Sequence, residues 1–433
     1  MRDTIKKLII DFQEMQIQSG VSRKLELKFA AGKATALIGV RRSGKSTFLL
    51  QEIEKLLETG VSKENIVFLN FFDDRLHPLR HGNLNQIVEA YYSLFPYKKN
   101  KETVYFFFDE IQALTAWEPF VDRLLRTEKC RVYLTGSSAA MLSREIATQM
   151  RGRSVSWELF PFSFPEYLDY RGLEYKPPYS SKTSFILQEA FEQYWQSGGF
   201  PEVLGLESSL RVKIHQDYFQ TILFRDLVDR HNISHPRALS DLAHRLIDNS
   251  ASLYTINSLT NYLKSLGHKV PKTTVADYIA WLEDAYFLFT VYIYDPSIAR
   301  RKTNPKKIYC IDHALVTSTS PTILLNQGHL LENLVYTAIR RTCPESYYYK
   351  TKTGKEVDFI IPRSADSPLL IQVTETLLEP STRQREIADL REAMHETKTQ
   401  QGYIITRQEE DQVETKEGII YVLPVWQYLL KIN

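Results

Sequence analysis

The sequence has few cysteines, and none of them are paired by spacing. Only Cys130, Cys310 and Cys343 occur among 433 residues, and they lie far apart in the chain. Without a CxxC pair or a Cys/His cluster, the sequence carries no zinc-binding pattern. An odd number of scattered thiols is typical of proteins from a reducing compartment, which favours the cytoplasm.

Long apolar runs and an excess of charge of one sign are also missing. No apolar run approaches the roughly 20 residues needed to span a bilayer, and the first 15 residues have the pattern of an amphipathic helix rather than of a signal peptide. Lys and Arg number 54 and Asp and Glu number 52, which gives a net charge of +2. We therefore expect no membrane partner and no general coating of nucleic acid, although a near-neutral total allows a local basic patch.

What the chain does have is a series of short apolar runs separated by segments of helical periodicity. Continuous apolar strands are typical of a parallel sheet that is covered on both faces. We therefore predict an α/β fold whose first domain spans residues 1–160, with a helix and a lead-in strand within residues 1–30. The candidate strands of the sheet are 34–40, 66–71, 104–108, 132–135 and 155–159.

A phosphate-binding motif directly follows the first of these runs. Residues 39–47, GVRRSGKST, fit the pattern G-x-x-x-x-G-K-[ST]. The glycines let successive backbone N–H groups and the start of the next helix face a phosphate. We expect Lys45 to reach the β- and γ-phosphates and the Ser46 hydroxyl to ligate Mg²⁺. Arg41 and Arg42 can face phosphate or a partner, and the alternative is that they face solvent. The predicted ATP-binding residues are Gly39, Val40, Arg41, Arg42, Ser43, Gly44, Lys45, Ser46 and Thr47.

Two carboxylates end the third apolar run. The segment 104–108, VYFFF, leads directly to Asp109 and Glu110. Asp109 is expected to hold Mg²⁺, and Glu110 to polarise the water that attacks the γ-phosphate. Together with Lys45, these residues predict hydrolysis of ATP, with ATP and Mg²⁺ as the cofactors.

Two further positions are candidate catalytic residues. The next strand ends in 135–138, TGSS, where Ser137 or Ser138 can sense the γ-phosphate or orient the water; the alternative is a simple turn. The sequence 151–153, RGR, follows. Within it we prefer Arg153 as an arginine finger that acts in a neighbouring subunit or across a domain cleft, with a solvated basic turn as the alternative.

The rest of the chain is predicted to form three parts: a helical connector at 161–237, a segment at 238–325 that resembles a winged helix–turn–helix, and a smaller α/β domain at 326–433. Basic residues flank a β-ribbon in the second of these parts. Lys272, Thr273 and Thr274 open its candidate recognition helix, which makes DNA a candidate partner. A module that packs against a protein is the alternative.

Together these motifs resemble a widespread prokaryotic family of AAA+-like ATPases that carry a C-terminal domain of unknown function. The strings that carry the resemblance are GVRRSGKST, FFFDEIQ, LTGSS, RGR and PFSFPEY, in this order. The match extends over nearly the whole chain. It implies a P-loop domain, a winged-helix segment and a terminal domain similar to the PD-(D/E)xK nuclease fold.

The nuclease-like part departs from the pattern of active enzymes. In active nucleases of that fold, acids bind Mg²⁺ and a lysine helps to activate water. Glu332 and Asp358 match the acids, but the dyad positions hold Gln372 and Thr374. The resemblance therefore implies a degenerate domain. The nearby residues that could compensate are Glu356, Lys350 and Lys352.

The predicted function is an ATP-hydrolysing switch or motor in the cytoplasm that acts on a DNA or protein partner, as a monomer or an oligomer. One alternative is a nuclease gated by ATP, against which Gln372 and Thr374 weigh. The other is a nucleotide sensor without hydrolysis, against which the pair Asp109 and Glu110 weighs.

Overall fold

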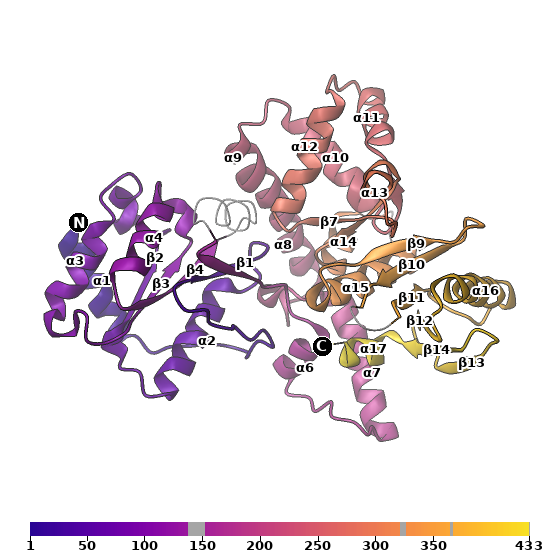
Figure 1. Ribbon diagram of the computed structural model, residues 1–433, viewed down its shortest axis with the longest axis horizontal. Coiled ribbons are helices and arrows are strands. Elements are labelled where there is room, and N and C mark those ends of the chain that lie inside the picture. The colour runs from indigo at the N-terminus through magenta and orange to yellow at the C-terminus, as the bar shows by residue number, and fades with distance from the viewer. Residues whose placement is uncertain (137–151, 321–325, 364–366, 433) are drawn as a thin grey trace. The chain divides into compact units, whose positions relative to one another are not determined.

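The computed structural model describes residues 1–136, 152–320, 326–363 and 367–432 (Figure 1). The chain divides into two compact units, Met1–Phe160 and Pro161–Asn433, which we describe one at a time. The finer division of the second unit, at residues 237 and 325, remains a prediction.

A five-stranded parallel sheet forms the centre of the first unit, with the strand order β2-β3-β4-β1-β5. β1 and β3 are buried along their whole length, as expected of continuous apolar runs. The predicted α/β fold, with its parallel sheet and the adjacent strands β1, β4 and β3, is confirmed. The strands are β1 (Ala34–Ile38), β2 (Ile66–Asn70), β3 (Val104–Asp109), β4 (Cys130–Gly136) and β5 (Ser154–Glu158).

Among the described residues of this unit, four helices pack on the sheet: α1 (Arg2–Glu14), α2 (Lys45–Glu58), α3 (Asn85–Leu94) and α4 (Trp117–Thr127). Successive side chains of a strand point to opposite faces. Phe107 accordingly lies in one core cluster with residues of α1 and α2. Its neighbours Phe106 and Phe108 contact Tyr91 of α3 and Phe120 of α4, with ring centroids 6.2 and 6.1 Å apart.

The predicted lead-in strand within residues 1–30 is wrong. After α1, residues 15–33 form no strand. Leu25 and Leu27 instead pack against the core cluster of Leu37, Phe48 and Leu159. Alternating apolar residues mark a segment with one buried side, and they do not show whether its backbone pairs with a sheet.

The second unit begins with helices. They are α6 (Phe164–Arg171), α7 (Ser181–Ser197), α8 (Ser208–Thr221), the π-helix η7 (Ile222–Val228), α9 (Asp229–His231) and α10 (Pro236–Asp248). Of these, α6 starts with a complete capping box between Ser163 and Glu166. α10 has a strongly amphipathic pattern, and its apolar side is buried.

A small antiparallel sheet follows, with the strand order β6-β8-β7. The predicted β-ribbon is present as β7 and β8, and the basic segment between the two strands forms the short helix α13. The elements are β6 (Leu253–Tyr254), α11 (Ile256–Ser265), α12 (Lys272–Asp284), β7 (Leu288–Val291), α13 (Ile298–Thr303), β8 (Lys306–Cys310) and α14 (His313–Thr319).

The chain ends in a six-stranded mixed sheet of the order β13-β14-β12-β11-β10-β9. Leu390 and Met394 of α16 pack on it in a core with Val357, Ile404 and Ile420. No described helix combines the length and apolar character that crossing a bilayer requires. The elements are α15 (Gln327–Thr342), β9 (Tyr347–Lys350), β10 (Glu356–Ile361), β11 (Leu369–Val373), α16 (Pro380–Thr397), β12 (Gln401–Thr406), β13 (Asp411–Glu414), β14 (Ile419–Pro424) and α17 (Val425–Lys431).

Candidate active site

The segment 39–47 forms the turn between the carboxyl end of β1 and the start of α2. Gly44 precedes the helix in the left-handed conformation, with φ 93°. Gly39 has φ 149°, and a Cβ atom at this position would lie 2.2 Å from the carbonyl oxygen of Leu159. Both the backbone angle and the close approach therefore require glycine at position 39.

The side chain of Lys45 folds back into this turn. Its Nζ donates hydrogen bonds to the carbonyl oxygens of Gly39 and Val40, at 3.0 and 2.9 Å. Only 5% of the side chain is exposed. Two carbonyl oxygens thus bind the ammonium, and the negatively charged oxygens of a phosphate group are stronger partners for it.

The other predicted ATP-binding residues differ in exposure. Ser43 is fully buried, whereas Ser46 and Thr47 at the start of α2 are exposed. Arg42 is exposed with φ 67°, and Arg41 is half-buried. The start of α2, which is the positive end of the helix, is therefore accessible to an anion or a hydrated cation.

A buried arginine that sequence reasoning missed supports this turn. Arg23 donates from Nη1 to the carbonyl oxygen of Ser43 at 2.9 Å and from Nη2 to that of Phe160 at 2.6 Å. Its own amide donates to Gln51 of α2, which also binds two carbonyl groups in the segment 19–21. No local pattern marks Arg23, because its partners lie up to 137 residues away along the chain.

The carboxylate of Asp109 is completely buried at the end of β3 and is bound from both neighbouring strands. Its Oδ2 accepts a hydrogen bond from Asn70 Nδ2 at 2.9 Å, and its Oδ1 accepts one from the Thr135 hydroxyl. Burial raises the pKa of Asp109, while hydrogen bonds from Thr135 and Ser46 and the charge of Lys45 act in the opposite direction. The two predicted metal ligands, Ser46 and Asp109, are therefore close enough for the Ser46 hydroxyl to lower the pKa of Asp109, and their oxygens are of the kind that Mg²⁺ prefers.

Glu110 follows in the left-handed conformation, with φ 56°, which is uncommon for a residue other than glycine. Its amide donates to Thr135 Oγ1 at 2.9 Å, and its Oε2 accepts a hydrogen bond from Gln112. Burial raises the pKa of Glu110, and the charges of Lys45 and Arg41 and the bond from Gln112 lower it. A carboxylate with a raised pKa is a better general base near neutral pH.

Asn70 and Thr135 were missed as site residues. Each stands at or near the end of an apolar strand, and a polar residue at such a place is the only signal that the sequence offered. Ser137 and Ser138, which we predicted instead, lie outside the described residues, as does Arg151. Their roles remain predictions.

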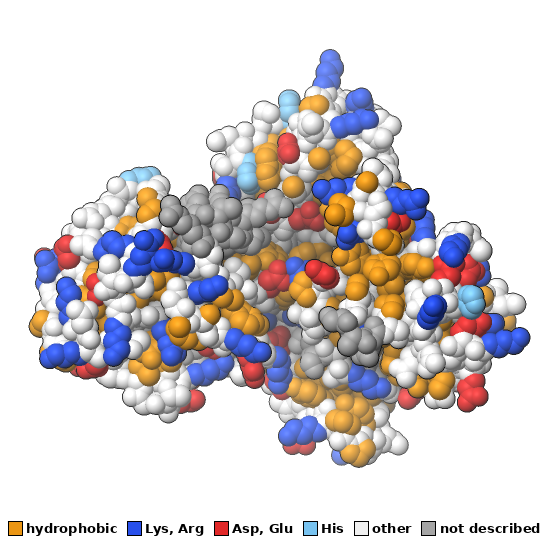
Figure 2. Space-filling model, in the orientation of Figure 1, with side chains coloured by type: hydrophobic (Ala, Val, Ile, Leu, Met, Phe, Trp, Pro, Cys, Tyr) orange, Lys and Arg blue, Asp and Glu red, His pale blue; other side chains and the backbone are white. Residues whose placement is uncertain are grey.

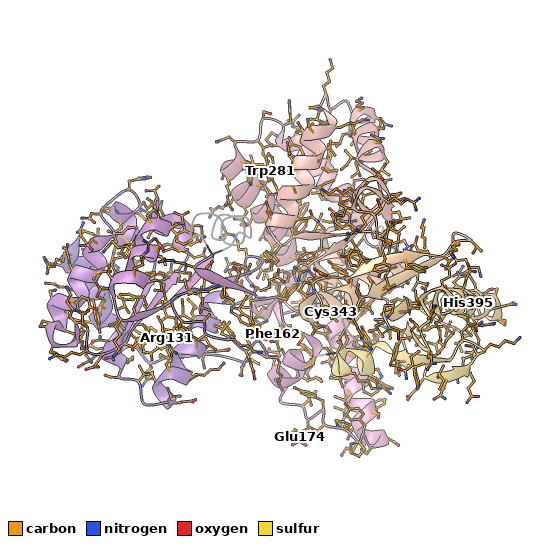
Figure 3. The ribbon with its side chains drawn as sticks, viewed as in Figure 1. Arg131, Phe162, Glu174, Trp281, Cys343 and His395 are labelled. Carbon is orange, nitrogen blue, oxygen red and sulfur yellow. The ribbon has the colours of Figure 1, made fainter. Side chains whose placement is uncertain are left out.

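The structure does not bring Arg153 to the P-loop of its own chain. Arg153 precedes β5, and its carbonyl accepts a hydrogen bond at 2.9 Å from Ala34, at the amino end of β1. The P-loop follows the opposite end of β1. Nη1 of Arg153 pairs with Asp122 of α4 at 3.1 Å. Arg131, labelled in Figure 3, also lies at the amino ends of the strands. Arg153 therefore lies at the end of the sheet opposite the P-loop of its own chain, and its role as an arginine finger remains a prediction.

Comparison with solved structures finds proteins of low overall similarity. A Walker-type ATPase of Pyrococcus abyssi is similar with a TM-score of 0.41 and 15% identity, over 74% of this chain and 95% of that protein. The ORC1 protein of Aeropyrum pernix, solved in complex with DNA, is similar with a TM-score of 0.30 and 13% identity, over 68% of this chain and 88% of that protein.

Sequence comparison divides the chain among three families. An AAA domain family matches residues 31–168. Two domains of unknown function, DUF8612 and DUF4143, match residues 188–323 and 327–428.

Two uncharacterized relatives match most of the chain. An uncharacterized protein of Methanocaldococcus jannaschii is 31% identical over 436 residues, which cover 98% of this chain and 95% of that protein. An uncharacterized protein of Haemophilus influenzae is 29% identical over 341 residues, covering 77% of this chain and 80% of that protein. The chain therefore belongs to the family of the Methanocaldococcus jannaschii protein, and its first unit is a P-loop ATPase domain of the AAA type.

Proposed function

We propose that this protein hydrolyses ATP with Mg²⁺ and that hydrolysis drives a switch acting on a macromolecular partner. The observation that supports the proposal is the buried carboxylate of Asp109 at the end of β3, bound by Asn70 and Thr135, with Glu110 beside it and Lys45 inside the P-loop. A protein that only sensed ATP would need the loop and the lysine. It would not need a buried carboxylate with a raised pKa next to the metal ligands.

The residues have the following roles in this proposal. Lys45 exchanges its carbonyl partners for the β- and γ-phosphate oxygens. Ser46 and Asp109 hold Mg²⁺, which when bound neutralises charge on the phosphates. Glu110 accepts a proton from water as the water oxygen bonds to the γ-phosphorus and the bond to the β-phosphate oxygen breaks. ADP and phosphate are the products.

Glu110→Gln tests this role, because glutamine keeps the shape of the side chain and cannot accept the proton. We expect turnover to fall by about 10²–10⁴-fold, the usual contribution of a general base, while ATP still binds. Glu102→Gln is the matched control, since Glu102 is exposed and precedes the opposite end of the same strand. Turnover by Glu110→Gln at the wild-type rate would refute the assignment.

We infer that the partner is DNA, bound by the second unit. The helices α11 and α12 lie between β6 and the strands β7 and β8 along the chain, and the three strands form a sheet of the order β6-β8-β7, which supports the predicted winged helix–turn–helix. Lys272 and Thr273 are exposed at the start of α12, the end that enters a groove in such folds. Figure 2 shows Lys and Arg side chains over α11 and α13. The exposed basic residues of this surface are Lys264, Lys269, Lys272, Arg300 and Lys302.

Binding of fluorescent duplex DNA at several salt concentrations tests this inference. Phosphate contacts make the logarithm of affinity fall steeply with the logarithm of salt concentration. Lys272→Ala should weaken binding and reduce that slope by about 1. Lys416→Ala, at an exposed site between β13 and β14, should change neither. Absent or salt-independent binding would exclude DNA and leave a protein as the partner.

A further inference from the structure

Far along the chain from the P-loop, three carboxylates converge on one buried lysine. Lys307 Nζ lies 2.9 Å from Glu332 Oε1, 2.9 Å from Glu356 Oε1 and 2.8 Å from Asp358 Oδ1. Only 3% of the lysine is exposed. Glu332 and Asp358 are the two acids that the nuclease-like resemblance implies as metal ligands.

The arrangement does not fit a divalent cation. Asp358 uses Oδ1 for Lys307 and Oδ2 for the backbone amide of Val373, at 2.9 Å. Oε1 of Glu332 also accepts a hydrogen bond from Tyr309, at 2.7 Å. A cation bound by these two acids would need the position that the ammonium holds. In the described ranges of the chain, no group of three or more His, Cys, Asp or Glu side chains is arranged to hold a metal ion.

The neutral residue at position 372 has a place in the same arrangement. Gln372 Oε1 accepts from the amide of Asp358 at 3.2 Å, and Nε2 donates to Glu386 Oε2 at 2.8 Å. A carboxylate at this position would lose the donor and face Glu386 with a like charge. Glutamine satisfies both partners, which gives a physical reason for the departure from the nuclease pattern.

The lysine also connects two parts of the second unit. Lys307 belongs to β8 of the small sheet, whereas its acids belong to α15 and β10. Next to it, Asn333 of α15 binds both backbone groups of Cys310, at 2.7 and 3.1 Å. The amide of Tyr348 in β9 donates to the carbonyl of Tyr292 at 3.0 Å. Charge and backbone contacts therefore attach the ribbon β7–β8 to the C-terminal sheet.

We propose that Lys307 is the resident cation of the nuclease-like site, in the place of a divalent metal, and that it fixes the ribbon β7–β8 to the C-terminal sheet. The domain is then a rigid support for the ribbon and not a nuclease. Two buried acids, Glu332 and Asp358, with the half-buried Glu356 beside them need a positive charge among them, and in this chain a lysine from a neighbouring sheet supplies it.

Binding of Mn²⁺ without nucleotide, followed by the loss of its free EPR signal, tests the proposal. The single variant Asp358→Asn, which keeps Lys307, should bind Mn²⁺ as the wild type does, because the wild type holds no metal at Asp358. Lys307→Ala should bind Mn²⁺ more tightly than the wild type, by on the order of tenfold, because a cation relieves the repulsion among the freed acids. Adding Asp358→Asn should abolish that gain. Loss of wild-type binding on Asp358→Asn, or no gain on Lys307→Ala, would overturn the proposal.

Thermal unfolding gives a second readout that does not depend on metal. Lys307→Ala should lower the melting temperature more than Lys306→Ala, since Lys306 on the same strand is half-buried and lies over the Tyr292 ring at 5.0 Å. If Lys307→Ala fails to fold while Lys306→Ala folds, the structural part of the proposal is supported, and the wild-type comparison with Asp358→Asn still decides the metal question. Equal melting temperatures for the two variants would contradict it.

Discussion

The Thr135 hydroxyl donates a hydrogen bond to Asp109 and accepts one, at 2.9 Å, from the backbone amide of Glu110. One side chain of β4 thus positions both carboxylates at the end of β3. The strand order accounts for this relationship, because β4 lies between β3 and the P-loop strand β1. The end of β4 therefore lies between the phosphate-binding loop and the two acids.

Removing this hydroxyl should slow ATP turnover. In Thr135→Val the side chain keeps its shape, but Asp109 loses a donor and the amide of Glu110 loses an acceptor. Since a hydrogen bond to a charged group is worth about 1.5–3 kcal/mol, kcat should fall by about tenfold or more. Thr135→Ser is the control and should retain most of the activity. A wild-type kcat for Thr135→Val would show that the hydroxyl does not position the acids.

Arg23 should affect both stability and ATP affinity. Arg23→Met removes the donors to two buried carbonyl groups, which should lower the free energy of unfolding by about 1–3 kcal/mol and weaken ATP binding. Arg126→Met, which breaks an exposed ion pair with Asp122 on α4, should cost no more than about 1 kcal/mol. Urea unfolding and ATP titration measure the two effects. An unchanged ATP affinity in Arg23→Met would mean that its contact with Ser43 does not shape the loop.

Because Gly39 lies close to the carbonyl oxygen of Leu159, we predict that an added side chain at this position abolishes ATP binding. Gly39→Ala would place a Cβ atom against the Leu159 carbonyl, whereas Gly32→Ala, also at a positive φ, would meet nothing within 4 Å. Both variants carry the backbone cost of an alanine at positive φ, of about 1–3 kcal/mol, and Gly39→Ala adds the clash with the Leu159 carbonyl to it. We expect Gly39→Ala alone to lose ATP binding. Similar ATP binding by the two variants would show that the loop can shift to accommodate the atom.

The pH dependence of hydrolysis follows from Glu110. Burial raises the pKa of Glu110 above its ordinary value, and only the ionised form can accept a proton. Activity should therefore be present above this raised pKa and disappear as the pH falls through it, so the acid limb of kcat/KM should lie above the ordinary range of a glutamate. The hydrogen bond from Gln112 lowers the pKa, so Gln112→Leu should move the limb to higher pH. If the acid limb of Gln112→Leu stays in place or moves to lower pH, the limb reports the titration of a group other than Glu110.

Local sequence patterns were sufficient to place the P-loop and the two acids at the ends of buried strands. The P-loop and the acids at 109 and 110 are contiguous motifs, and continuous apolar runs predicted the strands that carry them. Contacts between distant segments were not predictable in this way. Arg23 and Asn70 have no local motif, because their roles depend on partners brought close by the sheet.

The C-terminal domain shows the same limit. Glu332 and Asp358 were identified as matching the nuclease pattern, and Gln372 as departing from it. The sequence did not reveal that Lys307, 25 residues before Glu332, fills the space among the acids. That pairing depends on the packing of β8 beside α15 and β10. The spacing of residues along the chain does not predict this packing.

The most direct test of the central claim is the rate of phosphate release from ATP by the wild type and by Lys45→Ala, each with Mg²⁺ and with chelator. We predict that the wild type turns over ATP only with Mg²⁺ and that Lys45→Ala loses turnover by at least about 10²-fold, as expected when a preorganised charge at the phosphates is removed. Equal rates for the two proteins, or a wild type that binds ATP with Mg²⁺ and releases no phosphate with or without DNA, would contradict the account.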